Sequence, residues 1–183
     1  MQSGSDAVLR RMARRCKTEE FAKIVRELRS KIPHFNITTD IIVGFPGESE
    51  QEWQDSFNFI KQMGFGHIHI FTYSSRAGTR AAELPNQITH EIKKQRSQQL
   101  HELAHKMKLA FCLENKDQEF SVLWEGYKEL QEDGTQRVFG YTPNYLRVAA
   151  ITANDHCVEN KITTTRLLAV EENYIFGKMI TNA

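Results

Sequence analysis

The feature that most constrains the fold of this 183-residue chain is the continuous apolar run Ile41-Ile42-Val43. β-branched residues in succession, without polar alternation, are typical of a strand that is buried on both faces in a parallel sheet. Parallel strands cannot be joined by a tight hairpin and need a helical crossover. The run, as the end of a strand over residues 36–43, therefore predicts an arrangement of alternating strands and helices.

The segments around this run supply the elements that such an arrangement needs. The spacing of apolar residues predicts helices over residues 5–15 and 18–31, one from Ser49 to Gly64, and a long one from about Thr89. Alternation predicts a second strand over residues 65–73. Ser49 and Glu52 have capping-box spacing, and Gly64 suits a helix end. Two parallel strands are too few to close a barrel.

The pattern changes after Asn115. Short β-type runs follow, separated by turn signals such as Glu132-Asp133-Gly134. The predicted strands cover residues 119–124, 137–141, 146–151, 163–170 and 174–180. Several short strands in so short a segment predict a small antiparallel β-barrel. We place the domain boundary between Asn115 and Gln118, which divides the chain into residues 1–116 and 117–183.

The charge is divided in the same way. The formal net charge is only +1, but residues 1–116 carry 18 Lys and Arg against 13 Asp and Glu, a balance of +5. Residues 117–183 carry 6 against 10, a balance of −4. A nucleic-acid partner would therefore be attracted to the first part. No run approaches the roughly 20 apolar residues of a membrane span, and the polar, basic start does not resemble a signal peptide. We expect a cytoplasmic protein without a membrane partner.

The sequence offers no local metal site. Cys16, Cys112 and Cys157 are scattered and have neither cluster-binding nor zinc-binding spacing. His67 and His69 would share one face of a strand, but no third ligand lies nearby. We expect no metal ligand in this chain.

Three segments are candidates for ligand binding: QSGSD at 2–6, TTDIIVGFPGE at 38–48 and YSSRAGTRAAE at 73–83. Ligands of parallel sheets bind beyond the carboxyl ends of the strands, where the second and third segments lie. Gly44 and Gly47 would let a flat ligand approach the backbone, and Arg76 and Arg80 suit phosphate or carboxylate contacts. Taken singly, the first segment is more simply explained as a helix cap and the second as a turn without a special role. The arginines of the third are equally consistent with exposed loop charges.

Taken in order, QSGSDAVLRRMARR, TTDIIVGFPGESEQEW and FTYSSRAGTRAAELPNQI resemble the methylthiotransferase family of radical S-adenosylmethionine enzymes over about residues 2–112. VFGYTPNYLRV looks like the TRAM barrel that is appended to those enzymes. The resemblance implies an α/β fold: the C-terminal part of the radical SAM core, a partial (βα) TIM-like barrel, followed by a TRAM domain, a small OB-like antiparallel β-barrel.

The resemblance also implies a chemistry. Enzymes of this family cleave S-adenosylmethionine at one of two 4Fe-4S clusters and install a methylthio group at C2 of an adenosine. The cluster ligands are expected upstream of Met1, so the fragment alone is expected to be inactive. The loop over residues 73–88 is most similar to the branch that acts on N6-threonylcarbamoyladenosine beside the tRNA anticodon, which implies the anticodon stem-loop as partner. The isopentenyladenosine branch, the ribosomal-protein branch and a non-catalytic RNA-binding module are the alternatives.

Residue roles carry over only onto matching positions. The resemblance implies contacts with S-adenosylmethionine for Gln2, Ser3, Ser5, Arg14, Asp40, Gly44 and Phe45. It implies contacts with the substrate adenosine for Arg76, Gly78 and Thr79. It implies no catalytic residue in this chain. The acidic balance of residues 117–183 departs from an RNA-gripping TRAM domain, although Tyr141 or Tyr145 would suit base stacking.

Overall fold

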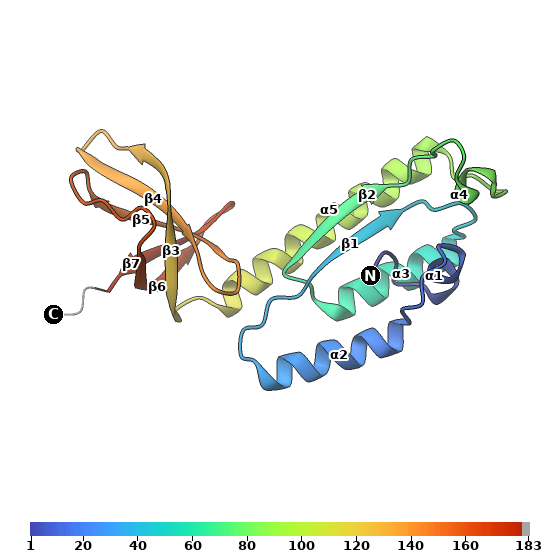
Figure 1. Ribbon diagram of the computed structural model, residues 1–183, viewed down its shortest axis with the longest axis horizontal. Helices are drawn as coiled ribbons and strands as arrows, with labels where there is room; N and C mark the ends of the chain where they lie inside the picture. Colours follow the sequence, from blue (N-terminus) through green and yellow to red (C-terminus); the bar gives the residue numbers. More distant parts are fainter. Residues whose placement is uncertain (181–183) are drawn as a thin grey trace. The chain divides into compact units, whose positions relative to one another are not determined.

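The computed structural model describes residues 1–180 and shows two compact units, Met1–Lys108 and a second that begins at Leu109 (Figure 1). The division falls inside helix α5 (His90–Glu114), because Phe111 and Cys112 near the end of this helix belong to the core of the second unit. The boundary at 116/117 lies just beyond the end of the same helix. The assignment of the two units to a radical SAM core and a TRAM domain stays a prediction.

The first unit is the expected βα arrangement. Its elements before α5 are α1 (Asp6–Arg11), α2 (Thr18–Lys31), β1 (Thr38–Val43), α3 (Glu50–Met63), β2 (His67–Thr72) and α4 (Arg80–Glu83). Strands β1 and β2 are parallel, with α3 as the crossover between them. Ser49 and Glu52 form the capping box at the start of α3, and Gly64 ends the helix in the left-handed conformation. The predicted α/β class is confirmed.

Two helical details differ from the sequence expectation. Helix α1 ends at Arg11 and not near Arg15, because Ala13 adopts a positive φ of 57° that interrupts helical geometry. The single turn α4 was not predicted, since four residues are too few to show a helical period.

Helices cover one face of the two-stranded sheet. Ile41, Val43 and Ile68 point into a core that also contains Trp53 of α3 and Leu100 of α5. The alternate positions lie on the other face and are exposed or half-buried: Thr38, Asp40, Ile42, His67, His69 and Phe71. The run Ile41-Ile42-Val43 is therefore buried mainly on one side in this chain. The open face is where a ligand has access to the sheet.

The second unit is a closed five-stranded barrel. Its strands are β3 (Glu119–Leu130), β4 (Thr135–Tyr141), β5 (Arg147–Ala153), β6 (Ile162–Val170) and β7 (Ile175–Met179). The order is β3-β4-β5-β7-β6, and pairing of β3 with β6 closes the barrel. The predicted small barrel is confirmed. One pairing, β5 with β7, is parallel, and the others are antiparallel.

Strand β3 runs well beyond the predicted end at Trp124. An irregularity in register between Trp124 and Lys128 bends the strand, so that its first part pairs with β6 and its last part with β4. Trp124 is fully buried, and its indole N–H donates to Thr163 Oγ1 at 2.7 Å. Among residues 1–180, no helix is both long and apolar enough to cross a membrane.

Candidate functional site

The structure brings the three candidate segments to the same small sheet. Val43 lies beside Thr72 in the parallel register, and Tyr73 N–H donates to the Val43 carbonyl at 2.9 Å. The ring of Phe45 contacts that of Tyr73 edge-on, with centroids 5.3 Å apart. The N-terminal segment lies along the other edge of β1, where Ile42 N–H donates to Gln2 O at 2.9 Å. The carboxyl ends of the two strands and residues 1–5 therefore form one candidate site.

The segment after β1 is a tight turn. Glu48 N–H donates to Phe45 O at 3.0 Å, and Gly47, third in this turn, has a φ of +74°. This is the type II turn that Pro followed by Gly predicts. Gly44 also has a positive φ, and a Cβ there would overlap the side chain of Lys93. Glycine is required at Gly44 on both grounds, and the Lys93 stem already fills that side of the backbone.

A buried ion pair that was not expected fixes this turn. Glu48 Oε2 accepts hydrogen bonds from Gly44 N–H and from Arg96 Nη1, both at 2.9 Å. Arg96 Nη1 also donates to the Glu48 carbonyl at 3.1 Å, and Nη2 donates to Glu50 at 3.0 Å. Burial raises the pKa of the Glu48 carboxyl, although the hydrogen bonds from Gly44 and Arg96 act in the opposite direction. The pair ties the turn to helix α5.

A sequence signal for this ion pair exists. Arg96 precedes Leu100 by four residues and therefore lies on the same buried stripe of α5. Its guanidinium carbon is 5.7 Å from the ring centroid of Trp53, which further encloses it. An arginine on an apolar stripe is expected to have a buried acidic partner, and Glu48 is that partner.

Most residues of the first segment are enclosed by helix α3. Ser3 is buried, its Oγ accepts from Ser5 N–H at 3.2 Å, and Ser56 Oγ lies 3.4 Å away. Gly4 N–H donates to Ser56 Oγ at 2.8 Å, and a Cβ on Gly4 would lie 2.6 Å from the Ser56 carbonyl. Ser5 is buried at the N-cap of α1, with no side-chain hydrogen bond to the helix. Contacts of Ser3 and Ser5 with a ligand stay a prediction.

The arginines at the end of α1 and just after it, Arg11 and Arg14, differ in their surroundings. Arg11 forms two hydrogen bonds with the Glu52 carboxylate, at 2.9 and 2.6 Å, and these bonds lower the pKa of Glu52. Arg14 is exposed. Arg11 therefore has a structural role that links α1 to the start of α3, while the side chain of Arg14 is accessible to a ligand.

The open face of the sheet carries the remaining candidate for cofactor contact. Asp40 is exposed and lies beside His69 in the register, and Ile42 lies beside Phe71, which is 53% exposed. The rings of His67 and His69 have centroids 4.6 Å apart. His67 lies on the open face, but partial burial of its ring lowers its pKa, and the charges of His69 and Lys108 add to this. Within residues 1–180, no group of three or more His, Cys, Asp or Glu is placed to hold a metal ion.

The three predicted substrate contacts lie in an exposed loop after β2. Thr79 donates to the Arg76 carbonyl through its N–H at 3.2 Å and its Oγ1 at 2.7 Å. Gly78 has a φ of +79°, and nothing lies within 4 Å of a Cβ built there. In the described part of the chain, the Arg76 guanidinium has no ion-pair partner. The loop therefore presents Arg76 to solvent beside the strand end.

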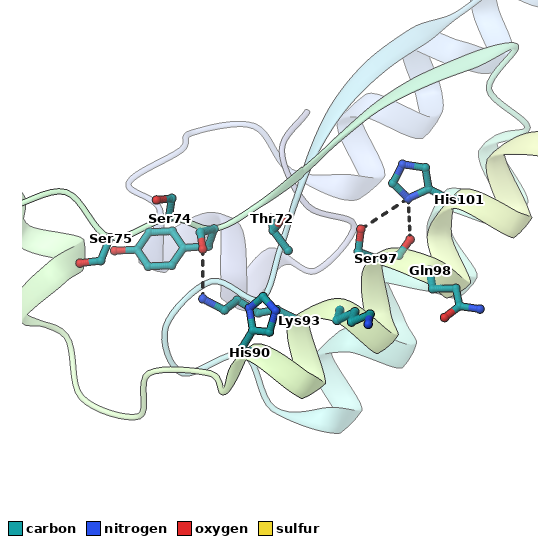
Figure 2. A pocket seen from close by; sticks show the side chains of 10 residues that line it. Thr72, Ser74, Ser75, His90, Lys93, Ser97, Gln98 and His101 are labelled. Atoms are coloured by element: carbon teal, nitrogen blue, oxygen red, sulfur yellow. Dashed lines mark hydrogen bonds between the residues drawn. The ribbon is translucent and has the colours of Figure 1, made fainter.

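A groove of about 570 Å³ opens next to this loop (Figure 2). We call it the β2–α5 groove. It is lined by residues 72–75 at the end of β2 and by one side of α5: His90, Lys93, Lys94, Ser97, Gln98 and His101. Lys93 reaches across to donate to the Tyr73 carbonyl at 3.2 Å. Sequence reasoning missed this groove, because the lysines and histidines of α5 look like an ordinary solvated helix face.

The barrel places aromatic and basic residues on neighbouring strands. Tyr141 and Tyr145 have ring centroids 5.0 Å apart, and Tyr145 is 76% exposed. Arg147 pairs with Tyr141 in the register and lies 4.7 Å from the Phe139 centroid. Arg137 contacts the Tyr174 ring at 5.9 Å. Arg137 and Arg147 thus each lie beside an aromatic ring, in a domain whose sequence is acidic overall.

Comparison with known proteins gives consistent matches. Residues 1–60 match the Radical SAM superfamily. The chain is 33% identical over 181 residues to the threonylcarbamoyladenosine tRNA methylthiotransferase MtaB of Bacillus subtilis, covering 98% of this chain and 39% of the relative. It is 43% identical over 145 residues to the tRNA-2-methylthio-N(6)-dimethylallyladenosine synthase of Tropheryma whipplei, covering 78% and 30%. The synthase of the same name from Caldicellulosiruptor saccharolyticus is 31% identical over 98% of this chain and 37% of its own length. The chain thus spans well under half the length of these relatives.

Proposed function

Because the chain belongs to the radical S-adenosylmethionine methylthiotransferase family, we propose that it forms part of an enzyme that attaches a methylthio group to an adenosine of tRNA. The observation that carries this proposal is the 33% identity with a tRNA methylthiotransferase across 98% of the chain, through both units. The placement of all three family segments against one two-stranded sheet supports it.

Within the family, we propose the branch that acts on N6-threonylcarbamoyladenosine, with the anticodon stem-loop as the RNA partner. The relative that carries this activity in its name aligns over 98% of the chain. The dimethylallyl branch is the competing candidate, since the Tropheryma relative is 43% identical over 78% of the chain and the Caldicellulosiruptor relative also aligns over 98% of it. The loop over residues 73–88 is the segment on which we base the choice.

The open face of the sheet suits the binding of S-adenosylmethionine. Ile42 and Phe71 offer apolar surface for a flat purine, and the exposed Asp40 carboxylate accepts hydrogen bonds from hydroxyl or amino groups. Arg14 is accessible for a carboxylate. When bound, S-adenosylmethionine supplies the radical chemistry that activates the C2–H bond of the substrate. The residues of this chain bind and orient it and exclude water.

The cysteines of this chain do not fit an iron-sulfur cluster. Cys16 and Cys157 are exposed and Cys112 is buried, and they are divided between the two compact units. A cluster needs several cysteine thiolates that converge on one site. The proposal therefore places the ligands of both 4Fe-4S clusters outside these 183 residues, and we assign no step to the cysteines.

The test is an assay of the intact enzyme that contains this chain, with reconstituted clusters and S-adenosylmethionine. Three tRNA substrates are compared: unmodified, threonylcarbamoylated and dimethylallylated. Mass spectrometry should find the methylthio product with the threonylcarbamoylated tRNA. Product only with the dimethylallylated tRNA would move the assignment to the other branch. RNA binding without any methylthio product would favour a non-catalytic module and contradict the proposal.

A variant pair tests the cofactor site. Asp40→Asn should weaken S-adenosylmethionine binding by about tenfold or more, since it removes a charged hydrogen-bond acceptor. The matched control is Asp55→Asn, an exposed aspartate of α3 that bonds only to its neighbour Gln51 within the described residues. Equal affinities of the two variants would remove Asp40 from the site.

A further inference from the structure

The β2–α5 groove has the chemistry of an anion site. Its α5 side carries Lys93, Lys94 and two histidines, and its other side carries the hydroxyl residues Thr72, Ser74 and Ser75, while the Tyr73 hydroxyl is buried. None of the lining residues, all of which belong to the described part of the chain, is acidic. Basic and hydroxyl groups without a carboxylate between them favour a bound anion with several acceptor oxygens.

The groove also has a cation that is free to bind. Lys93 donates to the Tyr73 carbonyl and lies 5.9 Å from the Tyr73 ring centroid, so it is partly engaged. His101 Nδ1 contacts the Ser97 carbonyl at 2.8 Å, which leaves Nε2 on the outer edge of the ring (Figure 2). Lys94 is exposed, and within residues 1–180 it has neither an ion-pair nor a hydrogen-bond partner. Lys94 is therefore the main candidate for a charge contact.

The length of the groove favours a polymeric anion over a single small one. From His90 to His101 the helix advances about 16 Å at 1.5 Å per residue. That length exceeds a single phosphate or carboxylate. Ser97 and Gln98 between the basic residues add groups that suit sugar and phosphate oxygens of a nucleic acid strand.

The groove is continuous in the chain with the predicted substrate loop. Residues 72–75 line it and lead directly into Arg76, Gly78 and Thr79, the residues predicted to border the substrate adenosine. The groove therefore adjoins the loop that is predicted to border the substrate adenosine.

We propose that the β2–α5 groove binds a backbone phosphodiester of the tRNA strand next to the modified adenosine, with Lys94 as its principal charge contact. This inference rests on the proposed function, because it takes tRNA as the substrate. It adds a sequence-independent contact that positions the strand, as phosphate contacts do.

The test measures binding of an anticodon stem-loop RNA to the intact enzyme over a range of salt concentrations. Lys94→Ala should weaken binding by about two- to tenfold and reduce the slope of log K against log salt by about 0.7 to 0.9, the value of one phosphate contact. Lys94→Arg should restore the slope. Alanine is the best helix former, so the variant is expected to fold. Lys61→Ala, which removes an exposed lysine from α3, is the matched control and should leave the slope unchanged.

The outcomes separate this inference from the function on which it rests. An unchanged slope for Lys94→Ala, with wild-type enzyme that still forms methylthio-tRNA, would overturn the groove assignment alone. Loss of slope in Lys61→Ala to the same extent would also overturn it, because the effect would then be non-specific. If Lys94→Ala weakened the binding of polyglutamate but not that of the RNA, the groove would bind an acidic protein partner instead. Absence of methylthio product from the wild-type enzyme, with the Lys94 effect intact, would contradict the proposed function and leave the groove as an RNA site.

Discussion

The two units of this chain differ in whether their sheet is closed. In the barrel, pairing of β3 with β6 closes the sheet, so every strand has two neighbours and one face is packed inside. In the first unit, only β1 and β2 pair, helices cover one face, and the other face is open. Closure removes strand edges and gives a self-contained core. The open sheet leaves polar and aromatic side chains accessible, and all the predicted contacts with S-adenosylmethionine and the substrate adenosine lie in that unit.

The centres of the two units also differ in chemistry. The barrel buries Trp124, Leu167 and Val148 fully, and its buried polar residues in the described part of the chain, such as Gln136 and Thr165, are uncharged. The first unit encloses the Glu48–Arg96 ion pair beside its apolar core, with side-chain exposures of 2% and 6%. A buried ion pair contributes less to stability than its geometry suggests, because both charges lose hydration. Its value here lies in fixing the turn at residues 44–48 against α5.

The largest expected effect comes from a substitution that tests whether the two units unfold independently. Trp124→Ala should cost the barrel about 3–5 kcal/mol by creating a cavity. The chain has two tryptophans, so Trp53 then reports on the first unit alone. Urea unfolding followed by Trp53 fluorescence should keep its midpoint, while circular dichroism should show loss of barrel structure. Leu123→Ala, at a position that is 50% exposed, is the control and should change little. A parallel loss of the Trp53 midpoint would mean that the two units unfold together.

The second prediction concerns the buried ion pair. Glu48→Ala should destabilise the first unit by about 3 kcal/mol or more, because it leaves the Arg96 charge buried with only an exposed partner. That partner provides the matched control. Glu50 also pairs with Arg96, but its side chain is 69% exposed, so Glu50→Ala should cost below about 1 kcal/mol. Urea unfolding measures both variants, with Trp124 replaced by Phe in each so that the fluorescence comes from Trp53 alone. Equal losses would show that burial of Glu48 does not decide its contribution.

The third prediction compares glycines of the two units. A Cβ at Gly140 in β4 would lie 2.8 Å from Val122 Cγ1 and 3.0 Å from the Leu123 carbonyl carbon. Gly140→Ala should therefore destabilise the barrel by about 1–3 kcal/mol through overpacking. Gly78 lies in open space but has a positive φ, so Gly78→Ala should cost about 1 kcal/mol of backbone strain in its loop. Barrel unfolding, followed by fluorescence in a Trp53→Phe background so that only Trp124 emits, should change only for Gly140→Ala. No change there would mean that the barrel adapts around β4.

Sequence reasoning predicted the regular elements of both units but missed specific contacts between residues far apart in the chain. The apolar run at Ile41, the capping box at Ser49 and the strand periodicities predicted both architectures, because local patterns and tertiary structure agree there. The burial of the run was predicted less well, since Ile42 lies on the open face of the sheet and is only half-buried. The Glu48–Arg96 pair and the β2–α5 groove depend on how α5 packs against residues 44–48 and 72–75. That packing joins positions about 20 to 50 residues apart, which no local period encodes. The same limit applies to Arg11, whose bond to Glu52 distinguishes it from the exposed Arg14.

The smallest expected effect is a pH dependence confined to the first unit. Burial lowers the pKa of His67 below its usual 6.5, so the unfolded chain binds the proton more readily than the folded one. The stability that neutral His67 allows is present above pH 6.5 and is lost as the pH falls through the lower, folded-state pKa. His67→Gln should flatten the rise in the Trp53 unfolding midpoint between acidic and neutral pH. Lys108→Ala, which removes one nearby positive charge, should flatten it only in part. An unchanged pH profile in His67→Gln would assign the acid sensitivity of this unit to its carboxylates. Arg11 lowers the pKa of Glu52, so the stabilisation of the unit by this pair is also lost as the pH falls.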